Sequence, residues 1–150
     1  MRKNTLAYVT NTKTKQTTRY NNYDFDHVVK FHGKHYGVKA DGLYLLEGNS
    51  DDGVQIESSF RTNKNDFGVS QLKRVPYLYV DSDDDTDVTP YIDGVDSGFK
   101  YLAAFDGKRT KLGRGLKGRY WSFEFSSIGG IGFRVRGVEI EPEVMTRKYS

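Results

Sequence analysis

Several clusters of side chains have types and spacings that could do chemistry, and the first is acidic. Five aspartates fall between positions 81 and 87, several at alternate positions, as in calcium-binding loops. Calcium prefers six to eight oxygen ligands, which closely spaced carboxylates can supply. The EF-hand pattern fails, because Thr86 stands where its glycine should be and Ile92 where its bidentate glutamate should be. A solvated acidic turn is the preferred interpretation.

The histidines His27, His32 and His35 lie close together in the sequence and could hold zinc with a carboxylate. Their neighbours Lys30 and Lys34 argue against a zinc site, because two positive charges oppose a bound cation. The chain also has no cysteine and no serine in a Gly-x-Ser-x-Gly turn. Paired carboxylates for sugar hydrolysis stay open, because separation along a chain does not give separation in space. We predict that the protein is not an enzyme and uses no cofactor.

A basic, glycine-rich segment occupies positions 107–118. Its glycines lack the strand–loop–helix setting of a phosphate-binding loop. The neighbouring Tyr120 and Trp121 could stack on bases. However, the residue alternation in their strand points Trp121 inward, and the net charge of +3 is small for a nucleic-acid-binding domain. These observations argue against a nucleic-acid partner.

Opposite charges on the two segments indicate contacts between molecules. An exposed ion pair stabilises a folded monomer by only about 0–1 kcal/mol, whereas charges repeated over an interface steer association and fix its register. We predict that the basic segment contacts an acidic surface in a homo-oligomeric ring, with the acidic loop of another copy as one candidate. Two solvated loops are the alternative. The predicted interface residues are Lys108, Arg109, Lys111, Arg114 and Lys117 on the basic side, and Asp81, Asp83, Asp84 and Asp85 on the acidic side.

The elements that must position these residues are predicted to be strands. Four Asp-Gly pairs separate stretches rich in aromatic and β-branched residues. Asp and Gly both tolerate the positive φ that a two-residue type I′ turn requires at its two central positions. No segment has convincing helical periodicity. No apolar stretch approaches the roughly 18 residues of a membrane-spanning helix, and the N-terminus lacks the apolar core of a signal peptide. The pairs are Asp41-Gly42, Asp52-Gly53, Asp93-Gly94 and Asp106-Gly107.

Residues 1–50 are predicted to form a small N-terminal β-meander. Its Gly33-Lys34 pair suits a type II′ turn, because the glycine comes first. Residues 51–150 have the strand number and spacing of an antiparallel, jelly-roll-like β-sandwich. One continuous unit is the alternative to two packed ones. The strands expected in the first part are 5–10, 15–20, 28–31, 35–39 and 43–46.

The best-defined strands of the second part are 119–126 and 132–141. In the first, three aromatic residues alternate with polar ones, as in a half-buried strand. In the second, the alternation slips at Gly137, which indicates a β-bulge. The other expected strands are 54–61, 75–80, 88–92 and 99–105, the last with Phe99, Tyr101, Ala103 and Phe105 on one face. The predicted core includes Trp121, Phe123, Phe125, Phe133, Val135 and Ile140.

A series of short motifs extends in order along nearly the whole chain. They are Tyr23-Asp-Phe25, Phe31-His-Gly33-Lys-His-Tyr36-Gly37, Asp41-Gly-Leu-Tyr-Leu-Leu-Glu-Gly48, Asp66-Phe-Gly68 with Lys73-Arg74, and Lys111-Leu-Gly-Arg-Gly-Leu-Lys-Gly-Arg-Tyr-Trp121, before a last strand ending at Pro142. Their order resembles that of small structural proteins of tailed-bacteriophage virions. The resemblance implies a non-enzymatic tail or baseplate subunit, made in the host cytoplasm, located in the virion and held by other tail proteins. It implies no catalytic residues.

The main alternative is a carbohydrate-binding β-sandwich module at a host-facing tail tip. Sugar binding needs exposed aromatic rings beside polar side chains, and Tyr23, Tyr91 and Tyr120 are the candidates. A polysaccharide hydrolase is a third possibility, since acidic residues are plentiful.

Overall fold

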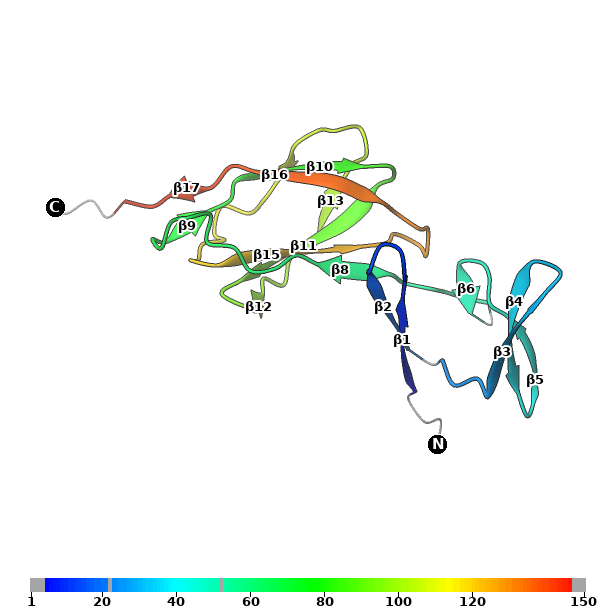
Figure 1. Ribbon diagram of the computed structural model, residues 1–150. Helices are drawn as coiled ribbons and strands as arrows, with labels where there is room; N and C mark the ends of the chain where they lie inside the picture. Colours follow the sequence, from blue (N-terminus) through cyan, green and yellow to red (C-terminus); the bar gives the residue numbers. More distant parts are fainter. Residues whose placement is uncertain (1–4, 22, 52, 147–150) are drawn as a thin grey trace. The chain divides into compact units, whose positions relative to one another are not determined.

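The computed structural model describes residues 5–21, 23–51 and 53–146. Contacts between Cα atoms divide the chain into two compact units, Met1–Gly48 (the N-terminal unit) and Asn49–Ser150 (the C-terminal unit). In the described ranges the only regular elements are strands, and every strand pair is antiparallel (Figure 1). The predicted all-β, antiparallel fold is therefore confirmed. None of the described residues belongs to a helix that could cross a membrane.

The N-terminal unit consists of a hairpin followed by a three-stranded meander. The hairpin pairs β1 (Leu6–Thr10) with β2 (Thr17–Asn21). The meander has the order β3 (His27–Phe31), β4 (Lys34–Lys39) and β5 (Gly42–Leu45). These bounds agree with the sequence patterns to within two residues, because each strand is a short run of β-branched and aromatic residues that ends at a turn.

The turn between β3 and β4 lies one residue earlier than the sequence analysis placed it. Phe31 pairs with Lys34, so His32 and Gly33 are the two turn residues. Their φ angles are 46° and 81°. Positive φ at both positions is the signature of a type I′ turn, whose twist matches that of the flanking strands. The prediction of a type II′ turn at Gly33-Lys34 was wrong.

One Asp-Gly pair forms the expected two-residue turn. Asp93-Gly94 has φ angles of 52° and 93°. Asp41-Gly42 does not form such a turn, because Gly42 already pairs with Lys39. Asp106-Gly107 lies within a longer connection between two strands, and Asp52-Gly53 falls partly outside the described residues. Of the three Asp-Gly pairs that are fully described, Asp93-Gly94 alone forms a turn of the required type.

The C-terminal unit is sandwich-like. One sheet has the order β14-β10-β16; the other has the order β12-β11-β15-β8, with β13 also paired to β11. Figure 1 shows β10 and β16 lying over β11 and β15. Two small pairs, β6–β7 and β9–β17, complete the unit. The strands are β6 (Ser50–Asp51), β7 (Val54–Gln55), β8 (Ser59–Arg61), β9 (Lys73–Arg74), β10 (Tyr77–Ser82), β11 (Thr86–Ile92), β12 (Val95–Asp96), β13 (Tyr101–Ala103), β14 (Thr110–Lys111), β15 (Trp121–Ser126), β16 (Val135–Ile140) and β17 (Glu143–Val144).

The core lies between the two sheets of this unit. Trp121, Phe123 and Phe125 of β15 are buried, as their alternation predicted. Burying such large apolar side chains supplies most of the free energy that stabilises a β-sandwich. The buried apolar residues are Val75, Leu78, Val80, Val88, Ala103, Leu112, Leu116, Trp121, Phe123 and Phe125, and the predicted Phe133, Val135 and Ile140 pack against them half-buried.

Two expected strands are shorter than their alternation suggests. The segment 54–61 is divided between β7 and β8, which pair with different strands, so the chain changes sheets between them. In the segment 99–105 only Tyr101–Ala103 pairs with β11. Phe99 and Phe105 lie beyond this pairing and are 56% and 62% exposed. Of the residues predicted to share one face, Ala103 is therefore buried, whereas Phe99 and Phe105 are not.

The predicted irregularity near Gly137 is present. Asp81 pairs with Gly137, and Ser82 pairs with Val135, so Arg136 is an extra residue opposite the β10 strand. This is a β-bulge. The acidic loop is also shorter than expected, because β10 runs to Ser82 and β11 begins at Thr86.

Candidate functional site

The acidic segment is paired with arginines of its own chain. The Arg136 side chain donates hydrogen bonds to both Asp81 and Asp83, with its Nη2 atom 2.7 Å from Asp81 Oδ1. Arg134 Nε lies 3.8 Å from Asp83 Oδ2. The hydrogen bonds from Arg136, helped by its positive charge, lower the pKa of Asp81. The bulge therefore supplies a cation that compensates the acidic end of β10.

The other aspartates of this segment have different surroundings. Asp85 Oδ1 accepts a hydrogen bond from the Phe105 amide at 3.0 Å. Asp87 Oδ2 lies 3.4 Å from Lys100 Nζ. Asp84 is exposed and makes no ion pair with any residue in the described ranges. Of the four predicted acidic contact residues, only Asp84 thus presents a carboxylate without a described hydrogen-bond or ion-pair partner.

The basic segment shows the opposite pattern. Lys108 pairs with Asp106 at 2.5 Å, and this hydrogen bond raises the pKa of Lys108 and lowers that of Asp106. The Arg109 guanidinium stacks over the Tyr77 ring at 4.4 Å from its centre. The predicted contact residues Lys111, Arg114 and Lys117 form no ion pair with any described residue. This segment therefore presents uncompensated positive charge.

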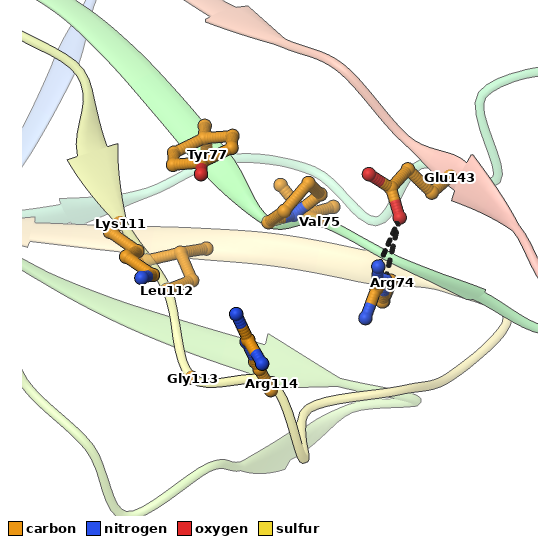
Figure 2. A pocket seen from close by; sticks show the side chains of 9 residues that line it. Arg74, Val75, Tyr77, Lys111, Leu112, Gly113, Arg114 and Glu143 are labelled. Carbon is orange, nitrogen blue, oxygen red and sulfur yellow. Dashed lines mark hydrogen bonds and ion pairs between the residues drawn. The ribbon is translucent and has the colours of Figure 1, made fainter.

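Lys111 and Arg114 line a cleft of about 320 Å³, which we call the Arg74 cleft (Figure 2). One wall is the start of β10, another is β14 with the glycine-rich loop after it, and a third is β17. The loop is held in place by the Leu112 amide, which donates to Pro76 O at 2.9 Å, and by the Gly113 amide, which donates to Tyr101 Oη at 2.9 Å. The lining residues are Arg74, Val75, Pro76, Tyr77, Lys111, Leu112, Gly113, Arg114 and Glu143.

Three cations and one carboxylate line the Arg74 cleft, which gives a net lining charge of 3 − 1 = +2. The carboxylate is already engaged: Arg74 Nε and Nη2 both lie 2.6 Å from Glu143 Oε2. Figure 2 shows the Arg114 side chain rising from the loop into the space between Lys111 and Arg74. The arrangement suits an anion held by side chains, because the amides of Leu112 and Gly113 already have partners.

The predicted site omitted Arg74, Tyr77 and Glu143. Arg74 and Glu143 come together because β9 pairs with β17, a pairing between distant parts of the sequence. The signals available were the adjacent cations Lys73-Arg74, just before a strong strand, and an extended arm near Glu143.

Behind Arg74 lies a buried lysine that the sequence did not single out. Lys73 has no exposed surface, and its Nζ donates to Arg119 O at 2.6 Å. Its backbone also exchanges two hydrogen bonds with Gly118, each 3.0 Å long. Lys73 therefore ties the end of the basic segment to β9 and fixes the loop that carries Arg114.

The N-terminal unit contributes a different surface. Residues that pair across β3, β4 and β5 share a face, so Val29, Tyr36 and Leu45 lie together, beside the row of His27, Val38 and Leu43. Phe31 is on the same face, and its cross-strand partner Lys34 forms the charged end of that face. We call this surface the meander's apolar face. Phe31 and Leu43 are each 63% exposed, and Val29 and Leu45 are also exposed.

The opposite face of the meander is partly covered. The Phe25 ring lies against Gly37, where any Cβ atom would overlap it. Lys39 Nζ stands 5.1 Å from the centre of the Phe25 ring and 5.3 Å from that of Tyr44, and it pairs with Asp24. That hydrogen bond with Asp24 raises the pKa of Lys39. Because Gly37 has no side chain, the Phe25 ring can pack against this face of the sheet.

The histidines do not converge. His27 pairs with Val38 and His35 with Lys30, which puts the two on opposite faces of the sheet. The His32 ring packs edge-on against Phe31, with ring centres 4.3 Å apart. Among the described residues, no three His, Asp or Glu side chains form a group that could hold a metal ion.

The tyrosines proposed for sugar binding occupy separate surroundings. Tyr91, in β11, has the Arg61 guanidinium 4.4 Å from its ring centre. Tyr120 is 48% exposed, just before β15. Tyr23, in the N-terminal unit, packs against Phe25 with ring centres 5.1 Å apart.

Comparisons of the chain with protein-family models, with curated proteins and with solved structures found no match.

Proposed function

We propose that the protein is a non-enzymatic structural subunit of a bacteriophage tail or baseplate, which acts through protein–protein contacts in an oligomeric assembly. The meander's apolar face carries the proposal. Soluble monomers rarely expose contiguous apolar surface, and such patches are typical of sites where another protein binds. The order of motifs from Tyr23 to Pro142, which resembles that of small tail proteins, supplies the phage context.

The packing of the N-terminal unit supports the same proposal. Every buried apolar side chain of the described residues belongs to the C-terminal unit. In the N-terminal unit, Gly37 is the single residue classed as buried in the described ranges. A small sheet needs an apolar face packed against something to be stable in water. A neighbouring subunit that covers Phe31 and Leu43 would supply that packing.

The test is incorporation into particles. Mass spectrometry of purified phage should find the chain in the tail fraction, and its gene should lie beside tape-measure and hub genes. In complementation of a deletion, Leu43→Glu should reduce incorporation strongly, because it places a charge in the apolar contact. The matched control is Lys30→Glu, which also changes an exposed meander residue but on the opposite face. Normal incorporation of the Leu43 variant would contradict the proposal.

A second candidate function is carbohydrate binding, which the surroundings of Tyr91 favour. Its ring lies on the outer face of β11, opposite Ser122 of β15, and Arg61 stacks on it. An aromatic ring beside polar and charged groups is the combination that a sugar-binding surface uses. A glycan array should detect binding that Tyr91→Ala abolishes, with Tyr23→Ala and Tyr120→Ala as the comparisons. No binding to any glycan would reject this candidate.

A further inference from the structure

We propose that the Arg74 cleft binds the carboxylates of an acidic peptide segment that belongs to a different protein of the assembly. The inference rests on the proposed function, because it names the partner that one surface of the structural subunit would take. Lys111 and Arg114 supply charge that no described carboxylate compensates, and Arg74 supplies a third cation at the same cleft. Guanidinium and ammonium groups are the usual partners of carboxylates in proteins.

The acidic segment of a second copy is a poor occupant. Arg136 already holds Asp81 and Asp83, and Lys100 holds Asp87. Docking these carboxylates in the cleft would require breaking ion pairs that exist within each chain. Asp84 and Asp85 alone form no ion pair with a described residue, and Asp85 already accepts a hydrogen bond from the Phe105 amide, so the two exposed charges contribute little. Charge complementarity therefore favours an acidic segment from another protein over the homotypic contact expected from the sequence.

A peptide also fits better than a nucleic-acid strand. The lining has one aromatic ring, that of Tyr77, and so lacks the series of rings on which successive bases of a strand stack. The cleft volume of about 320 Å³ is at the lower end of the range that holds small ligands, so it suits side-chain carboxylates rather than bases.

The experiment uses the full chain and a fluorescein-labelled hexaglutamate peptide, followed by fluorescence anisotropy. The peptide should bind at low salt, and binding should weaken as salt is raised. The double variant Lys111→Glu/Arg114→Glu should weaken binding at least about tenfold, since like charges then face the peptide. The matched control is Lys13→Glu/Lys30→Glu, which makes the same change of net charge in the N-terminal unit and should leave binding within about twofold.

Glu143 provides a change of opposite sign. Glu143→Gln removes the negative charge of the lining and frees the Arg74 guanidinium, so the peptide should bind several-fold more tightly. Amide signals of Gly113 and Arg114 should shift on titration of the wild-type protein, which localises the peptide without any substitution.

The outcomes separate this proposal from the proposed function. Absent binding, equal loss in the control variant, or weaker binding after Glu143→Gln would each overturn the cleft assignment, even if the protein is found in phage tails. Tighter binding of a dodecamer of deoxythymidine with the same dependence on Lys111 would assign the cleft to nucleic acid, and displacement by millimolar phosphate would assign it to a small anion. Absence of the chain from virions would instead reject the tail function while leaving the peptide measurements intact.

Discussion

Gly118 shows how a single residue position fixes the junction behind the basic segment. A Cβ atom there would overlap Ile92 Cγ2 and would lie 2.9 Å from Asp93 Oδ2. The same Asp93 accepts hydrogen bonds through Oδ1 from the amides of Arg119 and Tyr120, at 3.0 and 2.9 Å. The side chain at the Asp93-Gly94 turn therefore reaches the chain next to Gly118, and no space is left for a larger residue.

We expect Gly118→Ala to lower the free energy of unfolding of the C-terminal unit by about 1–3 kcal/mol, the usual cost of overpacking. Fluorescence of Trp121 in denaturant measures this, because it is the single tryptophan and is buried in that unit. Gly115→Ala is the control: its Cβ atom would meet nothing within 4 Å, so the change should stay within about 0.5 kcal/mol. Equal effects of the two substitutions would contradict the packing argument.

Asp81 should show the effect of the bulge in its titration. Hydrogen bonds from Arg136 lower the pKa of Asp81 from its usual value of 3.8. A folded-state pKa below the unfolded value means that the interaction stabilises the fold above about pH 3.8 and is lost as the pH falls through the lower, folded-state value. NMR titration of the carboxyl should give a pKa below 3.8, which Arg136→Gln raises toward 3.8. Lys100→Gln, which removes a cation paired with Asp87, should leave the Asp81 titration unchanged.

At the scale of elements, alternation along a strand predicts which residues share a face but not whether another element covers that face. In β15 the prediction was right, because the strand lies between two partners and its apolar face meets the second sheet. In the segment 99–105 the same pattern was misleading, because the partner strand covers only its middle. Local sequence carries no information on how long a distant partner is.

The same reason explains why the sequence predicted only some of the residues that line the Arg74 cleft. Lys111 and Arg114 were singled out because charges cluster locally there, and a local cluster is visible in a sequence. Arg74 and Glu143 were missed because their contact depends on pairing between residues 69 positions apart. The compensation of the acidic loop by Arg136 was missed as well, since it depends on the register of β16 against β10.

Substitution of two phenylalanines tests directly whether a neighbouring element covers the face of a strand. Phe123→Ala removes a buried ring from β15 and should cost about 3–5 kcal/mol of unfolding free energy. Phe105→Ala is the same substitution at a residue that is 62% exposed, and it should cost less than about 1 kcal/mol. Urea denaturation of both variants measures the difference. Similar losses would mean that the ring of Phe105 is covered in solution.

At the scale of the whole molecule, burial is distributed unequally between the two units. The C-terminal unit holds the entire buried apolar core of the described residues, whereas the N-terminal unit exposes Val29, Phe31, Leu43 and Leu45 on one face. Local stability follows the number of buried apolar contacts. The isolated chain should therefore open in its N-terminal unit long before it unfolds globally.

Hydrogen exchange measures this difference directly. Backbone amides of β1–β5 should exchange on the order of 100-fold faster than those of β11 and β15 in the isolated protein. In assembled particles the amides of β3–β5 should become protected, because a neighbour then covers the meander's apolar face. The amides of β11 and β15 serve as the internal reference. Equal protection of both units in the isolated chain would show that the N-terminal unit is stable on its own.

The β-bulge at Arg136 also has a consequence for how the protein survives at high concentration. β16 is the outermost strand of its sheet, and such strands are templates on which another chain can add a strand and begin to aggregate. A bulge bends the strand and interrupts the regular spacing of its free amides and carbonyls, and exposed Arg136 and Glu139 place charges along it. The irregularity that pairs Arg136 with Asp81 therefore also makes this sheet edge a poor template for strand addition by another chain.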